Sequence, residues 1–205
     1  MPIKIYKPTS DGRRHSSVQT FDDVTKKKPE KSLIVFLTPN SGRNNQGVVT
    51  VRHQGAGVRK FYRIVDFKLT KFDVEATVTA IEYDPNRGPR IALVQYTDGV
   101  KSYVLAPEGM KVGDKVLSSQ KAIEAKTGNR MPLEFIPVGV FVHNLELTPG
   151  KGGQLVRGAG LSAQIVGMEE EYALVKLPSG EVRKILKECA ATVGTMGNAD
   201  YRLIR

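Results

Sequence analysis

The stretch ATVTAIEYDPNRGPRIALVQYTDGVKSYVL, residues 76–105, indicates the fold class of this chain most directly. It contains short runs rich in Val, Ile, Leu and Tyr that have the length and composition of β-strands, at residues 76–83, 91–96 and 102–105. Turn residues separate these runs: Asp-Pro-Asn-Arg-Gly at 84–88 and Asp-Gly at 98–99. The pattern predicts consecutive β-strands joined by tight turns.

Similar runs continue on both sides of this stretch. Upstream, the expected strands cover residues 48–53 and 61–68, which gives five short strands in about 60 residues. This density suits a small OB-like five-stranded barrel, although an open sandwich would show similar patterning. Downstream, a second set predicts an SH3-like small barrel, with strands at residues 138–147, 162–166, 172–177, 182–186 and 191–193.

The composition divides the chain into four segments. Residues 1–47 are rich in Lys, Arg, Pro, Ser and Asn and predict a basic extended N-terminal arm, with one short helix beginning at Thr20. The OB-like barrel is expected over 48–117, a polar linker over 118–132, and the SH3-like barrel over 133–205. The fold class is therefore mainly β.

Positive charge is concentrated at the start of the chain. The sequence has 31 Lys and Arg against 21 Asp and Glu, a net charge of +10. Residues 1–71 hold 15 basic and 5 acidic residues, so they carry all of this excess. Such a distribution predicts a polyanionic partner, and an arm that orders only when that partner is present.

Several classes of protein fit the sequence poorly. The single cysteine, Cys189, cannot form an intramolecular disulfide, and no signal peptide or apolar run of membrane-spanning length is seen. We therefore expect a reducing, cytoplasmic location and no membrane segment.

No constellation of residues predicts catalysis. His15, His53 and His143 lack metal-ligand partners at usable spacing, and Cys189 has no cue for an activated thiolate. The glycine-rich stretches 55–57 and 150–153 do not match nucleotide-binding loops. We expect no enzyme activity, no cofactor, and magnesium only as an RNA counterion.

Three basic segments fit polyanion chemistry instead. The loop at 42–47 places a cation and three amides between two glycines, so that phosphates and sugar hydroxyls can approach closely, although an ordinary polar turn would look similar. Cations also surround residues 55–57 and the glycine-rich loop at 149–157. The predicted RNA-binding residues are Arg43, Asn44, Asn45, Arg52, His53, Arg59, Lys60, Arg63, Lys68, Arg87, Lys151 and Arg157.

Five strings in one order give the chain a resemblance to the bacterial large-subunit ribosomal protein L2 family. They are GRNNQG at 42–47, RHQG at 52–55, YRIVDFK at 62–68, EYDPNR at 82–87 and PGKGGQLVR at 149–157. The opening YKPTS at 6–10 and the late ATVG at 191–194 also fit, so the resemblance spans essentially the whole chain.

The resemblance implies an OB-like barrel, an SH3-like barrel and an N-terminal extension threaded into large-subunit ribosomal RNA near the peptidyl transferase region. It further implies roles in subunit association and transfer-RNA placement, with neighbouring ribosomal proteins and small-subunit RNA as further partners. The location would be a cytoplasmic or an organellar ribosome.

Two departures from the family pattern stand out. Gly55-Ala56-Gly57-Val58 stands where the family usually has three glycines and a histidine, so a contact by that histidine is not expected. The sequence also lacks the usual basic C-terminal segment beyond Arg205, so no residue inherits the catalytic proposals made for its histidine.

Two other functions remain compatible with the pattern. One is a free regulatory protein that binds single-stranded RNA through surface aromatics. The other is a translation or RNA-processing enzyme, because barrels of this kind often accompany catalytic domains. The missing acid, base or metal cluster argues against the enzyme.

Overall fold

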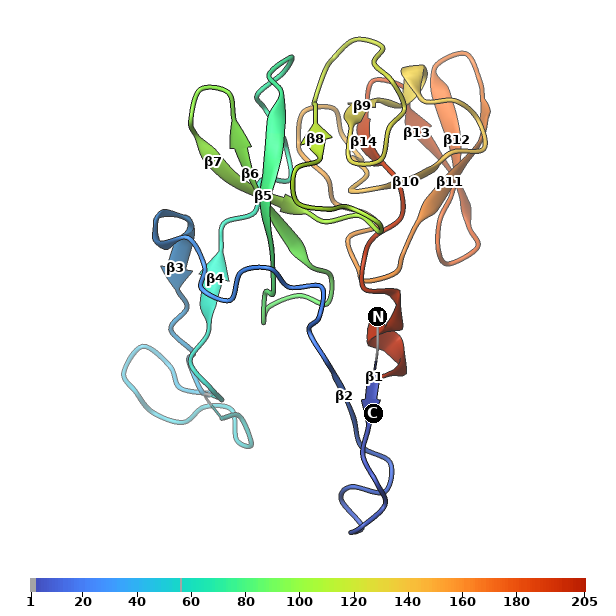
Figure 1. The fold of residues 1–205 in the computed structure, drawn as a ribbon. Helices are drawn as coiled ribbons and strands as arrows, with labels where there is room; N and C mark the ends of the chain where they lie inside the picture. Colours follow the sequence, from blue (N-terminus) through green and yellow to red (C-terminus); the bar gives the residue numbers. More distant parts are fainter. Residues whose placement is uncertain (1–2, 56) are drawn as a thin grey trace.

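The computed structural model describes residues 3–55 and 57–205, so Met1, Pro2 and Ala56, the centre of the predicted 55–57 hinge, lie outside the described residues. Within these ranges the chain consists of short β-strands in four sheets, linked by loops and short 3-10 helices (Figure 1). The prediction of a mainly β protein is confirmed. No helix in the described ranges is long and apolar enough to cross a bilayer.

The first large sheet lies in the middle of the chain and corresponds to the OB-like unit. It joins the antiparallel strands β5 (Ala76–Glu82), β6 (Ile91–Tyr96), β7 (Lys101–Leu105) and β8 (Lys115–Val116) in the order β7-β6-β5-β8. In β5, Val78 is buried while Thr77 and Thr79 are exposed, the alternation expected of a strand with one face on the core. The curled sheet encloses a core that includes Val78, Val94 and Val104.

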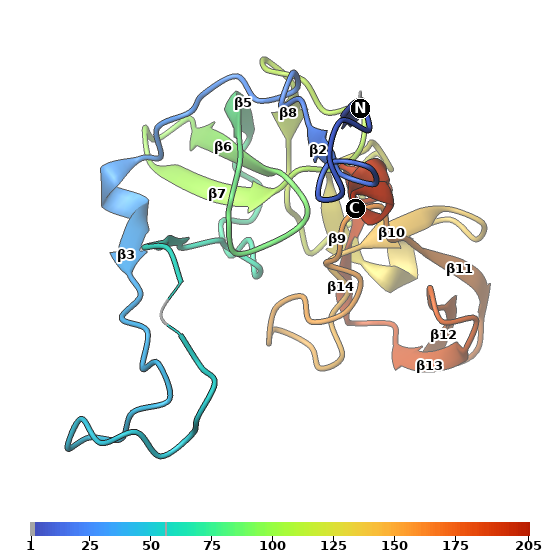
Figure 2. The same ribbon diagram turned by 90° about the horizontal axis from the view of Figure 1, so that it is seen from below.

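A separate two-stranded sheet, formed by β3 (Ile34–Phe36) and β4 (Phe61–Arg63), lies beside this unit. The strand predicted at 48–53 is not formed, and the strand predicted at 61–68 already ends at Arg63. Val48, Val49 and Val51 have high β-propensity but meet no partner strand, because residues 37–55 and 57–60 leave the body as one long loop (Figure 2). These residues are called the outer loop below.

The second large sheet contains most of the C-terminal half of the chain. Its antiparallel strands, in the order β13-β12-β11-β10-β14-β9, are β9 (Arg130–Pro132), β10 (Phe141–His143), β11 (Ala163–Met168), β12 (Tyr172–Lys176), β13 (Val182–Leu186) and β14 (Ala190–Val193). Residues 130–132 thus pair with β14, although they fall inside the segment predicted as a linker. The sheet surrounds a dense core that includes Met131, Leu145 and Ile165.

The N-terminal arm begins with a hairpin of β1 (Ile3–Ile5) and β2 (Ser17–Gln19). This hairpin lies against the last residues of the chain, which follow the 3-10 helix η3 (Ala199–Leu203). Ser17 N–H donates to Arg205 O at 2.9 Å, and Arg205 N–H donates to Ser17 Oγ at 2.9 Å.

The short helix predicted at Thr20 is wrong. The acidic pair forms a turn instead, in which Val24 N–H donates to Phe21 O at 3.1 Å. The chain then runs extended along β5, where Thr25 N–H donates to Ile81 O at 3.0 Å and Ile81 N–H donates to Thr25 Oγ1 at 2.8 Å. Pairing with the edge of β5 therefore overrides the local helix signal.

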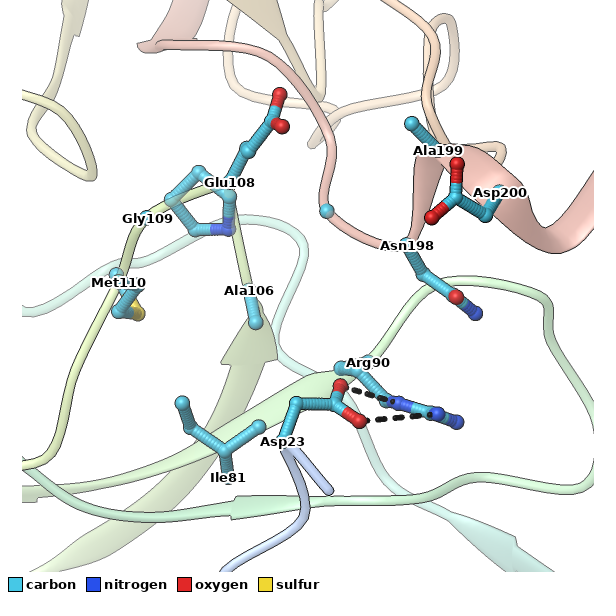
Figure 3. A pocket seen from close by; sticks show the side chains of 12 residues that line it. Asp23, Ile81, Arg90, Ala106, Glu108, Gly109, Met110, Asn198, Ala199 and Asp200 are labelled. Carbon is cyan, nitrogen blue, oxygen red and sulfur yellow. Dashed lines mark hydrogen bonds and ion pairs between the residues drawn. The ribbon is translucent and has the colours of Figure 1, made fainter. Parts of the chain in front are cut away.

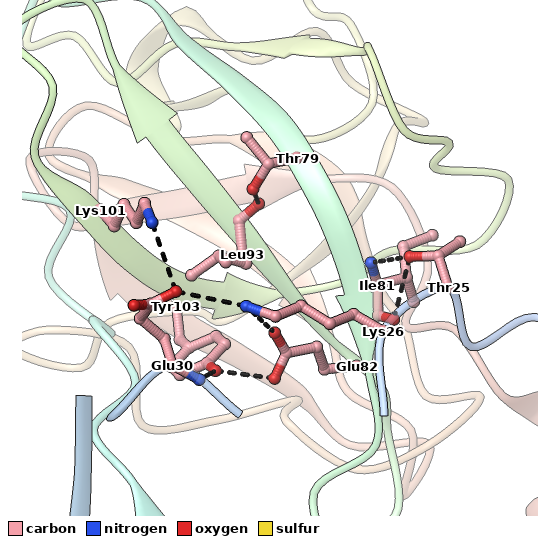
Figure 4. A network of polar contacts seen from close by, with 9 residues as sticks. All are labelled: Thr25, Lys26, Glu30, Thr79, Ile81, Glu82, Leu93, Lys101 and Tyr103. Atoms are coloured by element: carbon pink, nitrogen blue, oxygen red, sulfur yellow. Dashed lines mark hydrogen bonds and ion pairs between the residues drawn. The ribbon is translucent and has the colours of Figure 1, made fainter. Parts of the chain in front are cut away.

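A buried polar network holds the end of the arm to the first large sheet (Figure 4). Tyr103 Oη donates to Glu82 Oε2 at 2.7 Å and accepts Glu30 N–H at 2.8 Å. Lys26 Nζ lies 3.2 Å from Glu30 Oε2 and 3.5 Å from Glu82 Oε1. Burial raises the pKa of Glu82, and the bond from Tyr103 and the charge of Lys26 oppose that rise. The network fixes where the arm leaves the body, just before η1 (Lys31–Leu33).

Candidate nucleic-acid interface

The predicted RNA-binding residues fall into two spatial groups and one isolated position. The outer loop carries Arg43, Asn44, Asn45, Arg52, His53, Arg59 and Lys60, all of them exposed. Lys68, Arg87, Lys151 and Arg157 lie on loops that meet around Phe67 and are called the junction cluster. The isolated residue is Arg63.

The outer loop is a strongly cationic surface. Its sequence has four Lys or Arg residues, at positions 43, 52, 59 and 60, and no acidic residue. Figure 2 shows the loop projecting away from both large sheets. A long cationic loop without internal counter-charges is the kind of surface that a phosphate backbone neutralises.

Local hydrogen bonds give the tip of this loop a defined shape. Asn44 Oδ1 accepts the N–H groups of Gln46 and Val48, each at 3.0 Å. Gly42 has a φ of +69°, and its carbonyl accepts the N–H groups of Thr50 at 2.9 Å and Val51 at 3.0 Å. A Cβ at Gly42 would lie 2.1 Å from Val51 O, so only glycine fits here. The carbonyl oxygen of the Asn44 side chain is therefore occupied by the turn.

Arg63 lies inside the structure. It is 8% exposed, and its Nη1 donates to Phe61 O at 2.9 Å. Its charge also helps to lower the pKa values of Glu82 and Tyr103, against the larger effect of burial, which raises both. This position suits support of β4 better than direct contact with a phosphate.

The junction cluster is organised around the ring of Phe67. The guanidinium carbons of Arg157 and Arg87 lie 4.6 and 5.5 Å from its centroid, within cation–π distance. Asp84 is fully buried and orients Arg87, whose Nε donates to Asp84 Oδ2 at 2.6 Å. Arg87 also lies 5.5 Å from the centroid of Tyr62. Two arginines are thereby presented together from loops about 70 residues apart.

The glycine-rich loop at 149–157 packs its backbone against the residues around Phe67. Gly153 N–H donates to Phe67 O at 3.0 Å, and Asn144 Nδ2 donates to the same oxygen at 3.3 Å. A Cβ on Gly152 would lie 2.9 Å from Lys68 Cγ. The close approach that places Lys151 and Arg157 beside Lys68 thus depends on glycine.

A buried ion pair supports this loop from below. Arg130 Nη2 donates to Glu146 Oε1 at 2.8 Å, and the two side chains are only 1% and 4% exposed. Glu146 Oε1 also accepts Gly152 N–H at 3.0 Å, and Oε2 accepts Ala190 N–H at 3.0 Å. Arg130 Nη1 donates to Asn144 O at 2.8 Å. One carboxylate therefore joins the glycine-rich loop to β14 and, through Arg130, to β9.

The supporting residues Asp84, Arg130, Asn144 and Glu146 were not predicted as part of the site. Arg130 stood in the segment interpreted as a linker, and Asp84 in a turn. Asn144 and Glu146 gave the clearest sequence signal of supporting residues, since they place polar side chains in the apolar run at 138–147. A buried polar side chain needs a partner, but the sequence does not say which one.

A pocket of about 200 Å³ lies where the arm, the first large sheet and the C-terminal residues meet (Figure 3). Its wall includes Asp23, Glu108 and Asp200. Arg90 also lines it, but its Nε donates to Asp23 Oδ2 at 2.8 Å, and its Nη2 donates to Asp23 Oδ1 at 3.3 Å. Because Arg90 is paired with Asp23, the further carboxylates of Glu108 and Asp200 make the pocket unsuitable for a polyanion.

His143 and Cys189, two residues of types that often serve in catalysis, are buried and have shifted pKa values. Burial lowers the pKa of His143 to about 4, and its Nδ1 lies 2.9 Å from Gly194 O. Burial raises the pKa of the Cys189 thiol to about 11. Among the described residues, no group of three or more His, Cys, Asp or Glu side chains could hold a metal ion.

Comparison with known families gives two matches that together cover most of the chain. The model of Ribosomal Proteins L2, RNA binding N-terminal domain, matches residues 30–118. The model of Ribosomal Proteins L2, C-terminal domain, matches residues 126–205. The outer loop lies in the first match, and the junction cluster takes residues from both.

Proposed function

The chain belongs to the ribosomal protein L2 family, and we propose that its outer loop and junction cluster are the surfaces by which it binds the RNA of the large ribosomal subunit. Membership of this family makes it a structural, RNA-binding protein of the large subunit that serves translation. The finer assignment of residues is the proposal. It rests on the geometry described above.

The junction cluster is the observation that carries this proposal. Phosphate binding is stronger when several cations are already held in place, because a flexible lysine or arginine loses entropy when it is ordered. Arg87 is held by Asp84, and Arg157 is stacked on Phe67, so both are positioned before any RNA arrives. The backbone of the glycine-rich loop, next to Lys151, adds N–H donors that can approach a phosphate closely.

Within the ribosome, we propose a position near the peptidyl transferase region, with a supporting role in subunit association and transfer-RNA placement. Neighbouring ribosomal proteins, and small-subunit RNA at the subunit interface, are the further partners in this proposal. Family membership and the cationic N-terminal third support it. The role is architectural and not enzymatic, in a cytoplasmic or organellar ribosome, with magnesium only as the counterion of the RNA.

Sedimentation of ribosomal subunits tests the proposal. The wild-type chain should appear at one copy per large subunit on a sucrose gradient in magnesium buffer and should resist a moderate salt wash. The double variant Lys151→Glu/Arg157→Glu should be displaced to the top of the gradient. Lys111→Glu/Lys115→Glu, which makes the same charge change at exposed residues outside both groups, should sediment like the wild type.

The salt dependence of binding to purified large-subunit ribosomal RNA distinguishes variants that lose a phosphate contact from variants that fold poorly. Each lost phosphate contact should reduce the slope of log K against log salt by about 0.7 to 0.9. If the wild-type chain peaks among free proteins, the regulatory single-stranded RNA binder becomes the better assignment. Equal sedimentation of both double variants would show that the junction cluster is not part of the RNA interface.

A further inference from the structure

At the base of the outer loop the structure has a wide hollow of about 760 Å³. One wall is the end of β3, at Phe36 and Leu37, and the other is the returning chain at Val58 and Arg59. Lys60 and Asn86 also line it. The volume falls in the range typical of small-ligand pockets.

The apolar side chains of this hollow, Phe36, Leu37 and Val58, lie outside the hydrophobic cores of the described residues. Phe36 is 44% exposed and Val58 is 81% exposed. Phe61, 46% exposed, packs its ring edge-to-face on Phe36 with centroids 6.1 Å apart. A two-stranded sheet cannot cover both of its own faces, so this apolar surface remains open to a partner.

The charges around the hollow select the kind of partner. The segment from 31 to 65 has six cations and no acidic residue, so an anionic macromolecule is favoured. Arg59 places its guanidinium carbon 5.5 Å from the centroid of Phe36. An aromatic ring and an arginine plane side by side form the type of wall on which unpaired bases stack, and a neighbouring cation can meet the attached phosphate.

We propose that this hollow binds one unpaired base of the ribosomal RNA, stacked on the wall formed by Phe36 and Arg59, with the adjoining phosphate at Lys60. The inference rests on the proposed function and adds to it, because the predicted contacts of the outer loop were to phosphate and sugar. The hollow anchors a nucleotide that has left its helix.

Substitution of the ring tests the stacking. Phe36→Leu keeps an apolar side chain but removes the aromatic face, and it should weaken binding to purified large-subunit ribosomal RNA by about 5- to 100-fold. The salt slope should stay at the wild-type value, because no phosphate contact is lost. Phe141→Leu is the matched control: Phe141 is 49% exposed on β10, and its variant should bind like the wild type.

A second pair of variants avoids any effect on packing. Val58→Asp places a carboxylate in the hollow from a side chain that is already exposed, and it should weaken binding at least as much as Phe36→Leu. Val100→Asp makes the same charge change at a residue 48% exposed beyond β6, and it should have little effect. Circular dichroism of all four variants should match the wild type.

Ultraviolet crosslinking of the wild-type chain to the same RNA locates the base directly. The crosslinked peptide should contain Phe36, Phe61 or both, attached to a single nucleotide. If the wild type binds the RNA while Phe36→Leu and Val58→Asp match their controls, the hollow has no base and the proposed function stands. If the RNA crosslinks only to peptides outside the hollow, the base is again excluded. Failure of the wild type to bind would overturn both proposals.

Discussion

At the scale of single residues, Glu146 shows how much of this interface depends on groups that never reach the surface. Its two carboxylate oxygens accept from Arg130, Gly152 and Ala190. A buried carboxylate is stable only when such partners replace the water it has lost. Glu146 thereby determines the position of Lys151, although it cannot touch RNA itself.

Removal of this charge should therefore destabilise the protein strongly. Glu146→Gln leaves Arg130 buried without a counter-charge, and we expect the free energy of unfolding in urea to fall by about 3 to 5 kcal/mol. Glu169→Gln, which breaks the exposed pair with Lys184, should change it by less than about 1 kcal/mol. Similar losses in the two variants would show that the buried pair contributes no more than a surface one.

His143 should give the stability a specific pH dependence. Burial lowers its folded-state pKa to about 4, with a smaller contribution from the charge of Arg130, whereas the unfolded value is near 6.5. Between these values the unfolded chain binds a proton that the folded chain does not. The free energy of unfolding should therefore fall as pH drops from 6.5 to 4, by up to about 3 kcal/mol.

Urea titrations at several pH values check this expectation. His143→Gln should show a shallower fall over the same pH range, whatever its absolute stability. His15→Gln, at an exposed position in the arm, should keep the wild-type slope. An unchanged slope in His143→Gln would assign the pH dependence to other groups.

Single residues also show how far the site could be predicted from the sequence. Cations such as Arg157 and Lys151 could be proposed because charged side chains usually stay at the surface. The burial of Arg63 could not, since it depends on β3 pairing with β4 across the outer loop. The support from Glu146 to Gly152 depends in the same way on tertiary packing.

At the scale of elements, the outer loop depends on its tight turn at Gly42. Gly42→Ala should disorder the tip, because the new Cβ would meet Val51 O, and it should raise protease sensitivity within 37–60 and weaken RNA binding. The melting temperature should change little, since no described residue of the loop belongs to a hydrophobic core. Gly55→Ala is the control, because a Cβ there meets nothing within 4 Å. Equal protease sensitivity in both variants would contradict this account of the loop.

The bounds of the predicted strands were most accurate where a strand lies between two others or in a tight hairpin. The bounds of β6 and β13 agree with the prediction, because short runs rich in Val, Ile and Leu next to tight turns specify them locally. The run at 48–53 has the same composition and forms no strand. β-Propensity measures how well a residue fits a sheet, and it does not supply the neighbouring strand.

At the scale of the whole molecule, the two large sheets are joined by specific polar contacts. Asn144 Nδ2, just after β10, donates to Phe67 O, and Arg130 N–H, in β9, donates at 2.9 Å to the carbonyl oxygen of Leu117, just after β8. Ser118 also forms a β-bridge with Arg130, the first residue of β9. We therefore expect one cooperative thermal transition in calorimetry, although the chain matches two family models.

Asn144→Gly should weaken this coupling. Its φ of +49° is well suited to glycine, so the change removes the side-chain contact without adding backbone strain. We expect the transition to broaden or divide into two, with a lower first midpoint. Asn45→Gly, in the exposed outer loop, should leave a single transition. A single unshifted transition in Asn144→Gly would mean that the sheets are coupled by other contacts.

The pairing of Ser17 with Arg205 has a consequence for the order of events during synthesis. These residues are 188 positions apart, and translation at 5 to 20 residues per second separates their appearance by about 10 to 40 s. During that interval the basic arm cannot close onto its partner and stays accessible to nascent RNA or a chaperone. Protease protection of residues 3–19 in stalled nascent chains should accordingly appear only after Arg205 has emerged.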